Sequence, residues 1–382
     1  MRLAATSSPG AGGVTFKPLF QNERTASMGD LAIAPSDTLQ IWAGTGEEDA
    51  RNSISPGYGI YKSVDGGETW SHMGLEKTEH IARIVVHPTN PDIVWVAAMG
   101  ATWRENPERG LYRTTDGGRT WRNTLSKGPY TGVTDIVLDP RDPNVIYATT
   151  YQRDRRAWSF VGGGAESGMW KSTDGGETWA PLTQGLPTSE MGRIGLDVAR
   201  SQPNTLYATV DAAPAVGGIY RSDDAGATWR RVNELQSIPW FFGQIRVDPN
   251  NAERIYHLGV SLSVSDNGGE SFRRIAGNTH ADHHAMWIDP HDSDHLMIGN
   301  DGGFYISHDR GATWDFALNL PVATFYAIGV DMREPYWIYG GLQDNGTFGA
   351  PSSTRTILDL AGVRQDDNSQ RLEHDHRNVL PQ

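Results

Sequence analysis

The sequence predicts an all-β fold, a seven-bladed β-propeller of four-stranded blades. Three observations predict it. An eight-residue motif recurs six times, a strand–turn–strand unit recurs seven times, and the 382 residues include 44 Gly, 13 Trp and 13 Tyr. Glycines and aromatic residues at regular spacing are typical of short strands joined by tight turns.

The eight-residue motif has the form Ser/Thr-x-Asp-x-Gly-x-Thr-Trp, and its closing aromatic residues are 51, 58, 50, 43 and 42 residues apart. This interval is the size of a four-stranded blade, and the motif is the Asp box, or BNR repeat. We expect its hydroxyl and carboxylate to bond a hairpin turn, its glycine to take a positive φ and its Trp to pack between sheets, so that the Asp is structural. The copies are Ser63–Trp70, Thr114–Trp121, Ser172–Trp179, Ser222–Trp229, the looser Ser265–Phe272 and Ser307–Trp314.

The strand–turn–strand unit supplies the first two strands of each blade. It first appears as Leu31–Pro35 with Ile41–Gly44 and last as Ile328–Asp331 with Trp337–Gly340. Seven units and six Asp boxes leave one blade incomplete. We predict that its third strand comes from Thr347–Thr354 and its fourth from Val14–Leu19, which would close the ring and remove its free edges. The predicted propeller covers residues 14–356, after a flexible segment 1–13 and before a loose polar tail 357–382.

Composition excludes several classes of function. The chain has 33 Lys and Arg against 46 Asp and Glu, a net charge of −13, which argues against nucleic acid or anionic lipid as a partner. It has no Cys, which excludes disulfides, thiolate metal sites and a Cys nucleophile. No run approaches the roughly 20 apolar residues of a membrane helix, and the N-terminus is not a recognisable signal peptide. We expect no cofactor.

Strand order separates two faces of the predicted propeller. The turns between first and second strands share one face with the Asp boxes. The loops between second and third strands, and the connections between blades, share the other face. These loops are long and individual, so we predict that they carry the function.

Carboxylates on this face are candidates for acid–base chemistry, because glycoside hydrolysis needs two of them across the scissile bond. The alternative is that they cap turns or pair with Arg51 and Arg153. The candidates are Glu47, Glu48, Asp49, Asp282, Asp301 and Asp344, of which Glu48, Asp282, Asp301 and Asp344 are the predicted catalytic carboxylates.

The segment His280–His284 is the densest group of imidazoles. An acid–base role for His283 and His284, a divalent-metal site and a purely structural role all remain open; we predict proton handling and no metal. Aromatic, amide and Arg side chains of the same loops suit a sugar ligand. The predicted substrate-binding residues are Arg51, Asn52, Trp103, Arg153, Trp158, Trp240, Gln244, Asn300, Gln343 and Asn345.

Motifs beyond the boxes carry a family resemblance. They are Gly44–Glu47, Arg51–Ser53, Asp282–Pro290, Gly299–Gly303 and Gly341–Gly346. With the boxes, they make the chain resemble bacterial Asp-box proteins with a sortilin-type propeller, often labelled as glycosyl hydrolases and distantly similar to two-propeller xyloglucan-cleaving enzymes. The resemblance implies an extracellular or periplasmic location. In the xyloglucan-cleaving enzymes the cleft lies between two propellers and takes one catalytic Asp from each, whereas this sequence predicts a single ring.

The leading hypothesis is therefore a carbohydrate-active propeller, a glycoside hydrolase that acts on a polysaccharide or oligosaccharide through carboxylates. One alternative is a non-catalytic sortilin-type propeller that binds a peptide or protein. Another is the isolated first propeller of a larger two-propeller enzyme.

Overall fold

The structure is a computed structural model that describes residues 16–49, 54–318, 320 and 323–353, with the backbone of 5–6 and 364–366. Over these residues the chain forms seven four-stranded antiparallel sheets and two two-stranded ribbons. A 3-10 turn at Glu76–Thr78 is the one helical element of the described residues. The predicted all-β fold is confirmed. The chain divides into two compact units, residues 1–317 and 318–382, and each is described by itself.

The first unit holds six sheets, each made of successive strands in the order expected of a blade. Sheet 1 contains β3 (Met28–Ala34), β4 (Asp37–Thr45), β5 (Ile60–Ser63) and β6 (Ser71–His72). Sheet 2 contains β7 (Ile81–Val86), β8 (Val94–Ala98), β9 (Gly110–Thr114) and β10 (Arg122–Leu125). Sheet 3 contains β11 (Thr131–Leu138), β12 (Ile146–Gln152), β15 (Gly168–Ser172) and β16 (Ala180–Leu182), with the hairpin of β13 (Asp154–Arg156) and β14 (Ser159–Val161) inserted between β12 and β15.

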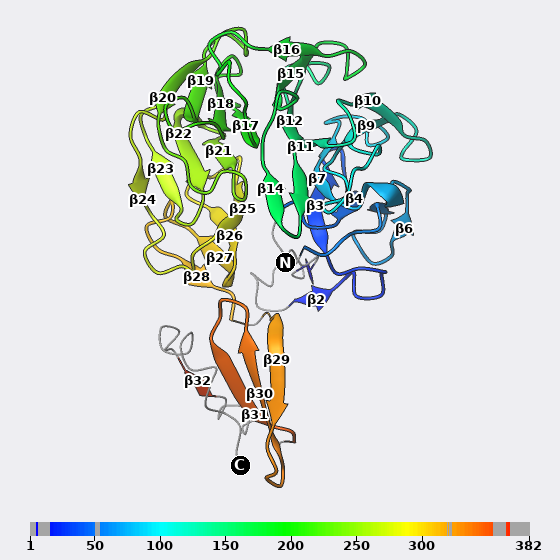
Figure 1. Ribbon diagram of the computed structural model, residues 1–382, viewed down its shortest axis with the longest axis vertical. Helices are drawn as coiled ribbons and strands as arrows, with labels where there is room; N and C mark the ends of the chain where they lie inside the picture. Colours follow the sequence, from blue (N-terminus) through cyan, green and yellow to red (C-terminus); the bar gives the residue numbers. More distant parts are fainter. Residues whose placement is uncertain are drawn as a thin grey trace. The chain divides into compact units, whose positions relative to one another are not determined.

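The remaining sheets of this unit repeat the pattern. Sheet 4 contains β17 (Ile194–Val198), β18 (Leu206–Val210), β19 (Gly218–Ser222) and β20 (Arg230–Asn233). Sheet 5 contains β21 (Gln244–Asp248), β22 (Asn251–Leu258), β23 (Ser263–Ser265) and β24 (Arg273–Arg274). Sheet 6 contains β25 (His283–Ile288), β26 (Leu296–Asn300), β27 (Gly303–Ser307) and β28 (Asp315–Phe316). The first strands β3, β7, β11, β17, β21 and β25 contact one another in this order, toward the centre of the unit (Figure 1).

Apolar side chains fill the spaces between neighbouring sheets. Trp42 and Ile60 of sheet 1 pack with Ile84 and Val96 of sheet 2, and similar clusters join sheets 2 to 3, 3 to 4, 4 to 5 and 5 to 6. The closing Trp of an Asp box takes part: the Trp121 ring meets Trp42 edge-on at 6.0 Å. Sheets 2 to 5 therefore each lie between two others, which explains the burial of every residue of second strands such as β8.

The Asp boxes form the predicted hairpin turns. In the third box Ser172 Oγ accepts from Gly176 N at 2.8 Å, and Asp174 Oδ1 accepts from Thr178 N at 3.0 Å. Gly176 has a φ of 87°, a backbone conformation that residues other than glycine rarely adopt. Gly175 N donates to Asn144 O in the turn between the first two strands of the sheet. Asp boxes and first turns therefore share one face, as predicted.

The second unit contains a seventh sheet of β29 (Phe325–Val330), β30 (Trp337–Leu342), β31 (Thr347–Pro351) and β32 (Arg364–Asp366). The predicted third strand, residues 347–354, corresponds to β31. The predicted fourth strand, residues 14–19, is not the one that pairs with β31. That strand is β32, whereas Lys17–Pro18 (β2) pairs with Ala5–Thr6 (β1). A strand of two or three residues pairs through backbone groups that every sequence offers, so its partner is not encoded in a local pattern. Residues 364–366 thus form a strand in the segment predicted as a loose tail. Closure of a seven-bladed ring stays a prediction.

Candidate functional site

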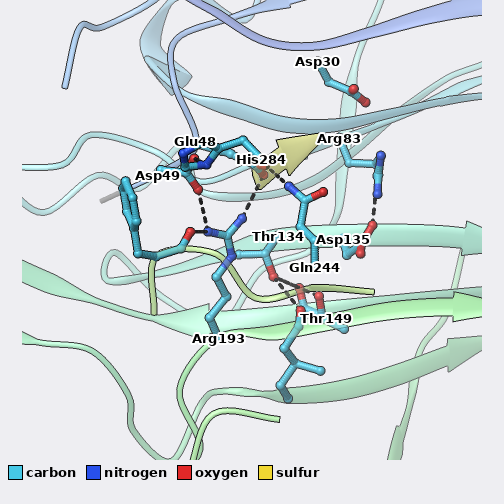
Figure 2. Close-up of polar contacts among 12 residues, drawn as sticks. Asp30, Glu48, Asp49, Arg83, Thr134, Asp135, Thr149, Arg193, Gln244 and His284 are labelled. Carbon is cyan, nitrogen blue, oxygen red and sulfur yellow. Dashed lines mark hydrogen bonds and ion pairs between the residues drawn. The ribbon is translucent and has the colours of Figure 1, made fainter. Parts of the chain in front are cut away.

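An ion-pair network joins the loop after β4 to the first strands of sheets 4 and 5. Arg193, which precedes β17, lies 3.2 Å through Nη2 from Glu48 Oε2 and 2.7 Å through Nη1 from Asp49 Oδ1. Gln244, at the start of β21, donates Nε2 to Glu48 Oε1 at 2.9 Å. Figure 2 shows these side chains converging from distant parts of the chain. We call residues 45–49 the acidic loop.

His284 on β25 extends this network to sheet 6. Its Nδ1 lies 2.9 Å from Asp49 Oδ2, and its Nε2 lies 3.2 Å from Asp301 Oδ1. Burial alone would lower the pKa of His284, but Asp49 and Asp301 outweigh burial and raise that pKa to about 9. Burial would raise the pKa of Asp49, and the charges of His284 and Arg193 outweigh it and hold that pKa well below its ordinary range. At neutral pH the site is therefore an imidazolium between two carboxylates.

A polar cavity of about 10 Å³ adjoins this network, the size of roughly one water molecule. Glu48, Arg193 and Gln244 line one part of it, and Arg83 and Asp135 line another. Arg83 Nε donates to Asp135 Oδ1 at 2.8 Å (Figure 2). Charged groups of both signs thus surround the centre of the first unit.

Aromatic side chains lie beside the network on the same face. The Trp240 ring meets Phe160 at 5.2 Å and Phe241 at 5.6 Å, and Phe241 meets the His284 ring at 5.2 Å. The Arg155 guanidinium lies 4.9 Å from the Phe160 ring centre and 5.8 Å from that of Trp103. We call Trp103, Phe160, Trp240 and Phe241, linked by Arg155, the aromatic row.

Asp211, which follows β18, is a carboxyl that the sequence analysis missed. Its N–H donates to Arg193 O at 3.0 Å, and its carbonyl accepts from Gly192 N at 2.7 Å. A Cβ at position 192 would lie 2.1 Å from Asp211 Oδ2 and 2.7 Å from Gly162 O, so this close approach requires glycine. Gly162 in turn lies against the Phe160 ring, which places Asp211 next to the aromatic row. Burial raises the pKa of Asp211 to about 6.

Other predicted residues of sheet 6 have local bonding roles. Asn300 Oδ1 accepts from Gly302 N at 3.0 Å and from Gly303 N at 3.1 Å, which holds the β26–β27 turn. His283 is 1% exposed. Burial lowers its pKa to about 4, and repulsion from His284 and His280 adds to this shift. Asp282 has a φ of 64°, and its N–H donates to Val260 O. Of the predicted proton handlers, His284 is the one in contact with two carboxylates.

The remaining predicted residues are placed as follows. Arg153 is fully buried, and Trp158 is 85% exposed and has no ring contact among the described residues. Arg51 and Asn52 lie outside the described residues. Gln343, Asp344 and Asn345 belong to the second unit. There Asn345 Nδ2 donates to Gln343 O at 2.8 Å, and Asp344 has a φ of 57°. The roles of Gln343, Asp344 and Asn345 stay predictions.

The described part of the chain contains no group of three or more His, Asp or Glu side chains arranged to hold a metal ion. None of its helical segments is long and apolar enough to cross a membrane.

Comparison with known proteins supports the resemblance. Residues 58–214 match the Sortilin-Vps10 family model, described as "Sortilin, neurotensin receptor 3". The chain is 26% identical over 289 residues to an oligoxyloglucan-reducing end-specific xyloglucanase of Emericella nidulans, covering 60% of this chain and 35% of the enzyme. It is 25% identical over 273 residues to a xyloglucanase of a Paenibacillus species, covering 67% of this chain and 22% of the enzyme. The chain thus spans about a third or less of these relatives.

Solved structures show the same fold. A GH74 enzyme of Niastella koreensis superposes with a TM-score of 0.60 at 21% identity, covering 90% of this chain and 55% of the enzyme. YCF48 of Cyanidioschyzon merolae superposes with a TM-score of 0.51 at 15% identity, covering 82% of this chain and 92% of YCF48. Together these matches confirm a sortilin-type, propeller-like fold distantly similar to xyloglucanases.

Proposed function

We propose that this chain is a carbohydrate-active propeller that binds a polysaccharide of the xyloglucan class on the loop face of its first unit. The aromatic row is the observation that carries the proposal. Trp103 is 41% exposed and Trp240 is partly exposed, so both rings can stack on the apolar faces of sugars. Arg155 and Asp301, both partly exposed, are charged groups suited to hydrogen bonds with sugar hydroxyls. The names of the relatives point to the same class of polymer, which also favours an extracellular or periplasmic location.

Binding is tested with the purified chain by titration calorimetry against xyloglucan, mixed-linkage β-glucan and xylan. Trp103→Ala and Trp240→Ala are each expected to weaken binding of the preferred polymer roughly tenfold. Trp287→Ala is the matched control, because Trp287 is 46% exposed but its ring contact is with His295 outside the row. A folded protein that binds none of the polymers would contradict the proposal and favour the peptide-binding or half-enzyme alternatives.

Hydrolysis of the bound polymer is the second candidate, and the opposite pKa shifts of two nearby carboxyl groups favour it. The pKa of Asp211 is raised to about 6, which suits a proton donor near neutral pH, whereas the pKa of Asp49 is held low. Acid–base hydrolysis of a glycoside uses two carboxyl groups whose pKa values are shifted apart in this way. In this proposal Asp211 is the general acid, and Asp49, which Arg193 and His284 keep ionised, is the second carboxylate.

Reducing-sugar release from the bound polymer tests hydrolysis. Asp211→Asn and Asp49→Asn are each expected to lower kcat by roughly 100-fold or more while binding persists. Asp344→Asn in the same series tests the predicted carboxylate of the second unit. Binding without any release would leave the chain as a binding module.

A further inference from the structure

Two buried arginines hold the same loop of sheet 2, between β8 and β9. Arg109, 1% exposed, donates Nη1 to Met99 O at 2.6 Å and Nη2 to Ala101 O at 2.5 Å. Arg153, which follows β12 and is 0% exposed, has Nη2 3.5 Å from Thr102 Oγ1. The two guanidinium groups therefore bond adjacent residues of one loop, 101 and 102.

Neither guanidinium is neutralised within the described residues. No carboxylate of that part of the chain lies within ion-pair distance of Arg109 or Arg153, and Nε and Nη1 of Arg153 and Nε of Arg109 have no hydrogen-bond acceptor there. Burial lowers the pKa of Arg153 to about 10 and that of Arg109 to about 9, with repulsion from neighbouring arginines adding to both shifts. Both groups remain charged at neutral pH, and an unpaired buried charge is strongly destabilising.

The nearby acidic loop does not remove this imbalance. Asp49 is one of the charges that act on Arg153, but its carboxylate already pairs with Arg193 and His284. The other polar groups close by are neutral. Tyr151 is 1% exposed and has no hydrogen-bond partner for Oη among the described residues, and the Thr102 hydroxyl, 2% exposed, lies 3.2 Å from Nε2 of the buried His80 imidazole. Guanidinium N–H groups and a Tyr hydroxyl that have no acceptor among the described residues are the donors expected to line an anion site.

We propose that a small monovalent anion, of halide or formate size, binds beside Arg153 and Arg109 with the hydroxyls of Thr102 and Tyr151 as further donors. Complete burial of all four side chains excludes a larger anion. The anion neutralises the excess positive charge and fixes the 99–104 loop. Because Trp103 is on this loop, the anion also supports one end of the aromatic row.

The test measures melting temperature in sodium bromide, chloride or formate against sodium gluconate, whose anion is too large for the site, at equal ionic strength. The wild-type chain is expected to melt about 2–4 °C higher in saturating small anion. Arg153→Met is expected to fold and to lose this difference, because it removes the charge that the anion neutralises. Arg141→Met is the matched control, since Arg141 is exposed and its ion pair is with Asp139, away from the proposed anion; it is expected to keep the difference.

A second measurement does not depend on any variant. Anomalous scattering from crystals of the wild-type chain grown in bromide is expected to show a peak within hydrogen-bond reach of Arg153. Equal melting in bromide and gluconate, or a water in place of the bromide peak, would overturn the proposal. Neither measurement involves a polysaccharide, so both test the anion site independently of the proposed carbohydrate function.

Discussion

At the scale of single residues, the site depends on charges that are buried together. Arg193 is 3% exposed and holds both Glu48 and Asp49. Glu48 was predicted from its place in a loop rich in carboxylates, but no local pattern marks Arg193 as its partner. The two residues are 145 positions apart, and only the folded chain brings them into contact.

Arg193→Met is expected to lower the free energy of unfolding by about 3–5 kcal/mol, because it removes the cation that pairs with buried Glu48 and leaves His284 as the remaining cation at Asp49. Urea unfolding of the purified chain measures this loss. Arg104→Met, which removes an exposed ion pair with Glu79, is the control and should cost less than about 1 kcal/mol. Equal stability of the two variants would show that the Arg193 pairs contribute little.

His284 predicts a pH dependence. Folding raises its pKa from about 6.5 to about 9, so the stability that it adds is complete below pH 6.5 and is lost as pH rises through 9. Its contribution is on the order of 3 kcal/mol. Denaturant unfolding between pH 6.5 and 9 should show this decline in wild type and not in His284→Gln. His291→Gln, at an exposed position, should keep it; a decline unchanged in His284→Gln would assign it to another group.

At the scale of elements, the sequence encodes the hairpins almost completely. The Asp box is a local structure, since its hydroxyl, carboxylate, glycine and Trp lie within eight residues. The second box makes with Thr114 the bonds that the third makes with Ser172: each hydroxyl accepts from the glycine N–H four positions on, at 3.0 and 2.8 Å. Sequence reasoning succeeded here because every interaction spans a few residues.

Ser172→Ala is expected to lower the free energy of unfolding by about 1–3 kcal/mol, because it leaves the buried Gly176 N–H without an acceptor. Ser172→Thr is the matched control and should be close to wild type, since Thr114 already fills this role in the second box. Thermal unfolding monitored by circular dichroism compares the two. A Thr variant as unstable as the Ala variant would mean that the hydroxyl bond is not the cause.

At the scale of the whole molecule, carboxylates tie one sheet to the next. Asp30 Oδ2 accepts from Ile84 N at 2.8 Å, and Asp135 Oδ2 accepts from Leu196 N at 3.1 Å. Each bond joins first strands of different sheets of the first unit. These links are non-local and could not be predicted, although each Asp lies directly before a segment predicted as a first strand.

Asp135→Asn keeps an oxygen for Leu196 N–H but removes the charge that faces Arg83. We expect a loss of about 3 kcal/mol in the free energy of unfolding, with one cooperative transition, measured in guanidinium chloride. Glu177→Gln is the control because Glu177 pairs with Arg113 and Arg122 at the surface, and it should cost less than about 1 kcal/mol. A similar loss in both variants would argue against a special role for the buried carboxylate.

The sequence by itself determined the class of fold, the hairpin turns, the strand order of the six sheets of the first unit and the face on which loops gather, because all four follow from patterns repeated within about 50 residues. It also named Glu48, Asp301, His284, Trp240 and Gln244, whose residue types stand out in long loops. Only the tertiary structure decided that Arg193 binds the acidic loop, that Asp211 lies against Gly192 beside the aromatic row, and that β32 rather than residues 14–19 pairs with β31. These contacts join segments far apart along the chain, and their energies depend on burial and on neighbouring charges that no local pattern contains.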